Sequence, residues 1–216
     1  MYFISIPIIV GIILGIYITT NLTSDSMSNQ PLITNSQLIK NGSPQIGLEN
    51  ATISIVEFGD YQCTFCKKFF HETEESILIN YVETGKVKML FKDFIVVDED
   101  SVNAASAAHC ANDQKMFWQY HSTLYNNWDG EGTGWASSEQ LHQFASTLGL
   151  DMNKFSECMS KSKWKDLVLS SHADGRTLGV DATPTFFIID ENNEALKITG
   201  AQRYDIFQDV FDSLLE

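Results

Sequence analysis

Two cysteines separated by two residues are the part of this sequence best suited to chemistry. Cys63 and Cys66 follow an apolar run, residues 53–58, that predicts a buried strand, and the residues after Cys63 predict a helix. The pair therefore stands at a helix N-terminus, where partial positive charge and free N–H groups favour a thiolate at Cys63. Thiols at this spacing can form a small-loop disulfide, so the motif indicates a redox-active dithiol.

A pair of cysteines at this spacing is also half of a zinc site, which needs two more ligands at a suitable distance along the chain. The remaining cysteines, Cys110 and Cys158, stand far apart and alone. The histidines show no metal-ligand spacing among themselves: His71, His109, His121, His142 and His172. We therefore expect redox chemistry rather than a metal site, and surface or capping positions for the histidines.

One carboxylate interrupts the predicted strand. Glu57 lies six residues before Cys63 among apolar neighbours. A buried carboxylate is costly unless it has a partner or a chemical task, whereas a surface position at the strand end is the alternative. Asp60, in the following loop, is better interpreted as a loop or cap residue than as a catalyst.

The composition fits a folded, acidic protein. The 216 residues are 44% hydrophobic and 12% aromatic, and the net charge is −14. Affinity for nucleic acid depends on neutralising phosphates with basic residues, so this charge argues against a nucleic-acid partner.

The chain begins with a nearly unbroken apolar segment, residues 2–18, followed by a tract rich in Ser, Thr, Asn and Gln. The segment is short for a membrane-spanning helix and long for the core of a signal peptide. We expect residues 1–20 to form an uncleaved membrane anchor, with a cleaved signal peptide as the alternative, and residues 21–45 to form a polar linker. The remainder would then be the extracytoplasmic domain of a single-pass protein of the cell membrane, or a secreted protein after cleavage.

Two stretches carry a family resemblance. GLENATISIVEFGDYQCTFCKKF, at residues 47–69, and GVDATPTFFIID, at residues 179–190, resemble the DsbA-like branch of the thioredoxin superfamily. The resemblance covers residues 47–216. It implies an α/β thioredoxin fold with an inserted α-helical domain, in an exported thiol–disulfide oxidoreductase that needs no cofactor.

The local patterns agree with that layout. Residues 46–216 would form the DsbA-like domain, with the helical insertion at about 98–178. Apolar runs predict strands at 86–97, 185–189 and 195–199, and apolar periodicity predicts helices at 66–83, 101–126, 135–148, 151–161, 164–178 and 204–215. Gly149 and Gly179 are expected helix stops.

The resemblance also implies roles for individual residues. Cys63 would be the nucleophile and Cys66 the more buried partner, with Glu57 as an acid beneath the pair that moves protons to and from Cys66. Thr183 and Pro184 would form the cis-proline loop that faces the pair and binds substrate. Phe65, Phe69 and Phe70 would form an apolar rim for unfolded substrates, with a position in the helix core as the alternative for Phe69.

The resemblance implies a second, structural disulfide. Some relatives with the same AAxCA…F..C arrangement carry a bridge at the places of Cys110 and Cys158. Closing a loop of nearly 50 residues would stabilise the fold by roughly 2–4 kcal/mol. The alternative is two buried free cysteines.

The first functional hypothesis is an exported enzyme that oxidises or shuffles cysteines in unfolded or reduced secreted proteins. The resemblance implies an integral-membrane redox partner that reoxidises it. Thr183 stands where the periplasmic oxidant has valine and isomerase relatives commonly have threonine, so the direction stays open and a reductase or isomerase is an alternative. A non-catalytic, client-binding thioredoxin-like protein and a copper chaperone are the others. We expect a monomer, because the residues before 47 are too few for a dimerisation domain.

Overall fold

The computed structural model describes residues 35–216 of the protein. The predicted membrane anchor and most of the predicted linker lie outside these residues. Within residues 35–216, no helix is both long and apolar enough to cross a membrane.

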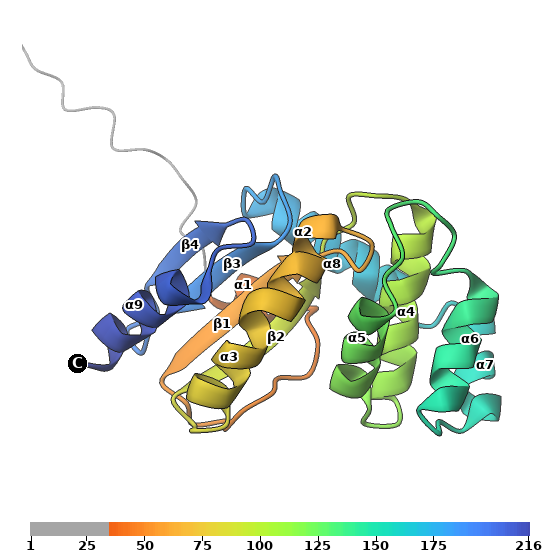
Figure 1. Ribbon diagram of the computed structural model, residues 1–216, viewed down its shortest axis with the longest axis horizontal. Coiled ribbons are helices and arrows are strands. Elements are labelled where there is room, and N and C mark those ends of the chain that lie inside the picture. The colour runs from red at the N-terminus through yellow and green to blue at the C-terminus, as the bar shows by residue number, and fades with distance from the viewer. Residues whose placement is uncertain (1–34) are drawn as a thin grey trace, which may run out of the picture. The chain divides into compact units, whose positions relative to one another are not determined.

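A four-stranded mixed sheet forms the centre of the fold, in the order β2–β1–β3–β4 (Figure 1). β1 runs parallel to β2 and antiparallel to β3, and β3 and β4 form an antiparallel hairpin. The strands are β1 (Ile53–Gly59), β2 (Val87–Asp93), β3 (Thr185–Ile189) and β4 (Ala195–Thr199). The expected strand at 86–97 is thus shorter than predicted, because residues 94–97 turn away into the loop that leads to the helical insertion.

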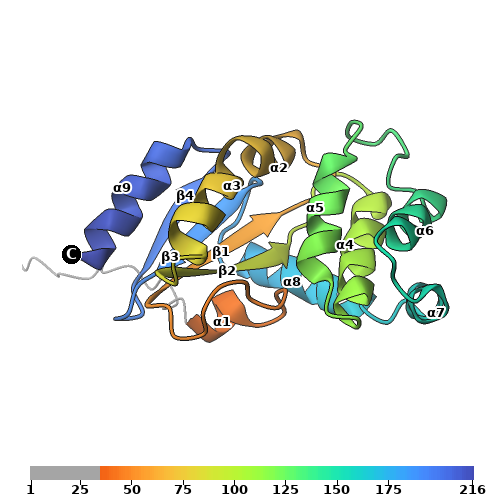
Figure 2. The same ribbon diagram turned by 60° about the horizontal axis from the view of Figure 1, so that its bottom comes forward.

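Helices cover both faces of this sheet (Figure 2). A continuous helical segment and α9 lie on one face, and α1 and α8 lie on the other. The continuous segment consists of α2 (Thr64–Phe69), η1 (Phe70–Glu74), α3 (Glu75–Ile77) and η2 (Leu78–Val82); the other helices are α1 (Asn35–Ile39), α8 (Lys165–Thr177) and α9 (Tyr204–Leu215).

The alternation of side chains along β1 places Glu57. Ile53 and Ile55 pack with residues of α2 and α9, whereas Val56 and Phe58 pack with residues near α1 and α8. Successive strand residues face opposite sides of a sheet, so Glu57 lies on the same face as Ile53 and Ile55. The carboxylate is therefore directed to the face that the cysteine-bearing helix covers.

Four helices between β2 and α8 enclose a second core. They are α4 (Glu99–Asn112), α5 (Phe117–Asn126), α6 (Ser138–Thr147) and α7 (Met152–Ser160). The prediction of one helical stretch over 101–126 is wrong, because Lys115 adopts a φ of 64° and the chain turns back between α4 and α5. Gly149 and Gly179 follow α6 and α8 with φ values of 77° and 72°, which confirms both as helix stops.

Candidate active site

The cysteine pair lies at the junction of the sheet and the helical insertion. Cys63 is the residue before α2 and has extended backbone angles, and Cys66 lies in the first turn. Both thiols are free. Cys63 is 6% exposed and Cys66 is fully buried, so the first cysteine is the one that a reaction partner can reach.

The two thiols differ sharply in acidity. The pKa of Cys63 is lowered from 9.0 to about 6, chiefly by a hydrogen bond from Cys66 and further by the Thr183 side chain and the N–H groups of Phe65 and Cys66, against the opposing effect of burial. Burial, first of all, raises the pKa of Cys66 well above 9.0. At neutral pH the pair therefore holds a thiolate at Cys63 and a proton at Cys66, which makes Cys63 both a nucleophile and a good leaving group.

The loop before β3 faces this thiol. The Thr183–Pro184 peptide bond is cis, as the resemblance implies. Cys63 Sγ lies 3.6 Å from the carbonyl oxygen of Thr183, to which the protonated thiol donates, across 120 residues of sequence. The fold thus brings together the two motifs that carry the resemblance.

Glu57 is fully buried, so the alternative of a surface carboxylate is wrong. Its strand neighbours are Phe91 on β2 and Phe186 on β3, and neither of its oxygens has a hydrogen-bond partner among the described residues. Burial raises its pKa well above 4.5, and the charges of Glu74 and Cys63 raise it further. Burial therefore favours the protonated form of Glu57, on the face of the sheet that the cysteine-bearing helix covers.

A thioredoxin family model matches residues 40–212, most of the chain. The chain belongs to the thioredoxin family, on its DsbA-like branch of thiol–disulfide oxidoreductases.

Named relatives and solved structures fit this placement. Disulfide bond formation protein D of Bacillus subtilis is 27% identical over 175 residues, which cover 80% of this chain and 76% of that one. The crystal structure of alpha-DsbA1 from Wolbachia pipientis superposes with a TM-score of 0.73 at 24% identity, covering 84% of this chain and 96% of the other. The crystal structure of oxidised BdbD from Bacillus subtilis superposes with a TM-score of 0.71 at 24% identity, covering 80% of this chain and 92% of the other. These structural matches show the shared fold.

Within this thioredoxin-family site, sequence reasoning missed several buried polar residues. Glu74 and His121 are 2% and 0% exposed, so the expectation of surface or capping histidines is wrong for His121. It is also wrong for His109, which is 2% exposed and shares a 2.8 Å hydrogen bond between its Nε2 and Asp93 Oδ2. For Glu74 the sequence held a signal. Cys66, Phe70 and Glu74 are spaced by four residues, which places them on one face of a helix.

The insertion contacts the start of the cysteine-bearing helix. The backbone N–H of Thr64 donates to the carboxylate of Glu131 over 2.8 Å. The same insertion loop also binds Gln62. The indole of Trp128 donates to the backbone carbonyl of Gln62 over 2.7 Å, and the N–H of Gly132 donates to its side-chain oxygen over 3.1 Å. The loop that carries Glu131 is thus fixed beside the active cysteine.

Asp60 has the loop role expected for it. Its carboxylate accepts hydrogen bonds from the backbone N–H groups of Gln62, Val96 and Val97, at 2.8, 2.7 and 3.1 Å. These bonds tie the loop before the cysteines to the loop after β2.

The expected apolar rim is smaller than the sequence suggests. The ring of Phe65 is 59% exposed beside Cys63, whereas Phe69 is 1% exposed and packs against Phe186 and Phe207. Phe70 is half-buried against Tyr125. Phe65 is therefore the aromatic of this group that can meet a partner chain.

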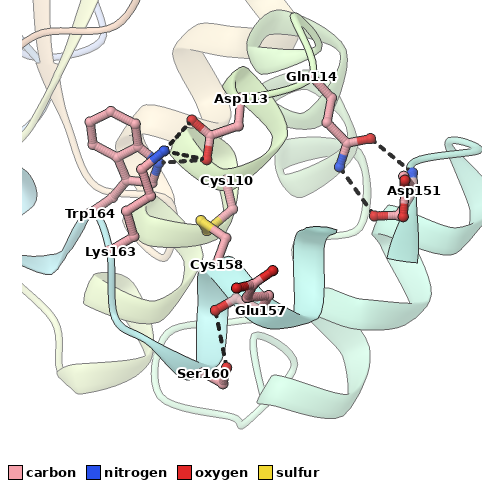
Figure 3. The surroundings of a disulfide bond; sticks show 9 residues. All are labelled: Cys110, Asp113, Gln114, Asp151, Glu157, Cys158, Ser160, Lys163 and Trp164. Carbon is pink, nitrogen blue, oxygen red and sulfur yellow. Dashed lines mark hydrogen bonds and ion pairs between the residues drawn. A yellow bond between two sulfur atoms is a disulfide. The ribbon is translucent and has the colours of Figure 1, made fainter. Parts of the chain in front are cut away.

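The other two cysteines form a disulfide between α4 and α7. The Cys110–Cys158 bond has an S–S distance of 2.01 Å and a Cα–Cα distance of 5.8 Å (Figure 3). Asp113, close to this bridge, pairs with Lys163 at 2.8 Å and accepts from the Trp164 indole at 3.3 Å. Within residues 35–216, no group of three or more His, Cys, Asp or Glu side chains is arranged to hold a metal ion.

Proposed function

We propose that this protein is an exported thiol–disulfide oxidoreductase that oxidises or shuffles cysteines in secreted or surface proteins through Cys63 and Cys66. The observation that carries the proposal is the difference between the two thiols. Cys63 reaches the Thr183 carbonyl and has a pKa of about 6, whereas Cys66 is fully buried.

In the oxidising direction, a substrate thiolate attacks Cys63 Sγ of the Cys63–Cys66 disulfide. The bond between the two sulfurs breaks and Cys66 leaves with the electron pair, taking a proton from the buried Glu57. A second substrate thiolate then attacks the mixed disulfide at the substrate sulfur, and Cys63 leaves as a thiolate. Two electrons have then passed from the substrate to the pair.

The low pKa of Cys63 supports this direction, because stabilising the thiolate stabilises the reduced form of the pair. The value of about 6 lies between those of thioredoxin, about 7, and of the strongest oxidant, about 3.5. Phe65, unlike a histidine, cannot donate a hydrogen bond to the thiolate. We therefore expect an oxidant milder than the strongest members of the branch.

The cellular setting is part of the proposal. The apolar residues 2–18 support a single-pass anchor in residues 1–20 with the thioredoxin-family domain outside the cell membrane. A secreted form after cleavage is the alternative. An integral-membrane redox partner would reoxidise Cys63 and Cys66, and the protein would act as a monomer.

The reduction potential of the pair, measured on the full-length chain against glutathione buffers, tests the proposal. A value of about −120 to −180 mV would support disulfide donation or shuffling. A value near about −270 mV would indicate a reductase instead. Failure of the oxidised protein to accept electrons from a reduced, unfolded protein at any potential would support a client-binding role without catalysis.

A further inference from the structure

Several buried polar atoms gather beneath the cysteine pair without hydrogen-bond partners. Among the described residues, seven buried side-chain oxygen or nitrogen atoms lack a partner, and four of them belong to Glu57, Glu74 and His121. These three side chains are at most 2% exposed. Buried polar atoms are nearly always paired, so an unpaired cluster beside an active site requires an explanation in terms of function.

Two members of the cluster, Glu74 and His121, face one another, and the charge of Glu74 acts on the third, Glu57. His121 Nε2 lies 3.6 Å from Glu74 Oε1, and its Nδ1 lies 3.1 Å from the hydroxyl of Tyr61. When Tyr61 donates to Nδ1, the neutral imidazole carries its proton on Nε2, towards Glu74. The charge of Glu74 also acts on Glu57, where it is the largest contribution after burial to a raised pKa.

Glu74 also borders a surface cavity. It lines a cavity of about 310 Å³ together with Phe70, His71, Glu75, Leu78, Ser122 and Asn126. His71, Glu75 and Asn126 are exposed, so the cavity opens at the surface. Of the three side chains in the cluster, Glu74 is therefore the one that lines this cavity, whereas Glu57 is fully buried.

The proposed exchange needs such a connection. When the Cys63–Cys66 bond breaks, Cys66 leaves as a buried thiolate and takes the proton of Glu57. Glu57 is then a buried carboxylate without a hydrogen-bond partner among the described residues, and another turnover requires a proton from outside.

We propose that Glu74, which lies 3.6 Å from His121 Nε2, is a proton-transfer residue that reprotonates Glu57 from the surface cavity. The inference rests on the proposed disulfide exchange. In the oxidising direction, the Glu74 carboxylate takes up a proton from solvent in the cavity and passes it to the Glu57 carboxylate. The reverse exchange moves the same proton outwards, from Cys66 through Glu57 and Glu74.

The titratable groups around Glu74 come from several elements. They are Glu57 from β1, Tyr61 from the loop after it, Cys63 and Cys66 at the start of α2, His121 and Tyr125 from α5, and His71 and Glu75 at the cavity. A pH profile alone would mix these groups, so the test uses removal and chemical rescue of one carboxylate.

The test measures single-turnover reduction of the oxidised full-length chain by a reduced dithiol peptide, from pH 5 to pH 9. Glu74→Ala is expected to slow the reaction by roughly tenfold, below the 10²–10⁴ of a directly acting acid, with forward and reverse rates falling together. Formate, a small acid that fits the space left by the side chain, is expected to restore the rate. Glu75→Ala, which removes an exposed carboxylate from the same cavity, is the matched control and should react at the wild-type rate.

Two further variants separate a proton path from a packing effect. Glu57→Gln should be slow without rescue by formate, and adding Glu74→Ala to it should cause no further slowing, because Glu74 acts through Glu57. Glu74→Gln keeps the shape of the side chain and should be slow even if the alanine variant folds poorly.

The outcomes are distinct. Wild-type rates in Glu74→Gln, or slow exchange in Glu74→Ala that formate leaves unchanged, would overturn the inference while leaving the proposed function intact. Absence of exchange in the wild-type chain would instead overturn the proposed function and the inference with it.

Discussion

The two cysteine pairs of this protein are both largely buried, yet one is a disulfide and the other is a pair of free thiols. Cys63 is 6% exposed and Cys158 is 7% exposed. Cys63 and Cys66 are three residues apart, whereas Cys110 and Cys158 are 48 residues apart. Burial alone therefore does not separate a reactive pair from a structural one.

The position of each sulfur along its helix is the first difference. Cys63 precedes α2, where the N–H groups of the first turn have no helical acceptor and can stabilise a thiolate. Cys110 and Cys158 lie inside α4 and α7, where backbone N–H groups are used by the helix itself. Only the first position offers donors to a sulfur anion.

The groups beneath each pair are the second difference. Glu57 is buried where the charges of Cys63 and Glu74 raise its pKa, and we propose that it supplies a proton to Cys66, whereas Cys110 packs among alanines of α4 in the insertion core. Asp113, the carboxylate near the Cys110–Cys158 bond, forms an ion pair with Lys163. We infer that proton supply and helix position, rather than accessibility, fit the first pair for exchange.

The largest expected effect comes from removing the nucleophile. Cys63→Ser should lower the rate of disulfide exchange by about 10³-fold or more, because an alcohol at this place is neither an acidic nucleophile nor a leaving group. Cys110→Ala/Cys158→Ala should keep most of the activity. Oxidation of a reduced, unfolded protein followed by thiol counting measures both. Equal losses of activity in the two variants would show that the two cysteine pairs contribute alike to exchange.

The second pair should act on stability instead. Cys110→Ala/Cys158→Ala should lower the free energy of unfolding by about 2–4 kcal/mol, since the bridge closes a long loop in the unfolded chain. Guanidinium denaturation of the variant and of the wild type, both with the first pair oxidised, gives the difference. The reduction potential of Cys63 and Cys66 should stay the same, and a changed potential would show that the two pairs are coupled.

The first pair should make stability depend on pH in the reduced protein. The pKa of Cys63 is depressed to about 6 from 9.0, so its thiolate stabilises the reduced fold fully above pH 9. That contribution is lost as the pH falls through 6. As the pH is lowered from 9 to 7 to 5, the denaturation midpoint of the reduced form should therefore fall relative to that of the oxidised form, in which Cys63 does not titrate. Parallel curves for the two forms would contradict the low pKa.

Much of this site can be predicted from sequence because its parts are local. The apolar run, the cysteine spacing and the proline before β3 each leave a signal in a few neighbouring residues, and the strands at 185–189 and 195–199 match β3 and β4. The break between α4 and α5 could not be predicted in this way, because Lys115 adopts a positive φ without a glycine to indicate it.

The buried polar network depends on tertiary contacts that a single sequence does not show. Glu74 and His121 belong to different helices, and only the packing of α5 against η1 brings them to 3.6 Å. The sequence pattern places each of them on an apolar helix face. It does not, however, identify which residue a histidine or glutamate at such a place will contact. The contact of Glu131 with Thr64 depends on an irregular insertion loop and is similarly hidden.

The smallest of these effects is expected at the start of α2. Glu131 places a negative charge on the N–H of Thr64, next to the thiolate that the same helix end stabilises. Because charges at an exposed helix N-terminus contribute about 0.3–1 kcal/mol, Glu131→Gln should lower the pKa of Cys63 by roughly 0.5 and make the pair a slightly stronger oxidant. Alkylation rates against pH measure the change.

Asp129 supplies the matched control for this prediction, because it carries the same charge in the same loop and is exposed. Asp129→Asn should leave the pKa of Cys63 nearly unchanged. Thr64→Pro removes the N–H that Glu131 accepts from, and proline is well tolerated in the first turn of a helix. In that background Glu131→Gln should have a smaller effect. An effect of the same size would mean that Glu131 acts on Cys63 through space alone, and that the insertion loop tunes the first pair without the hydrogen bond.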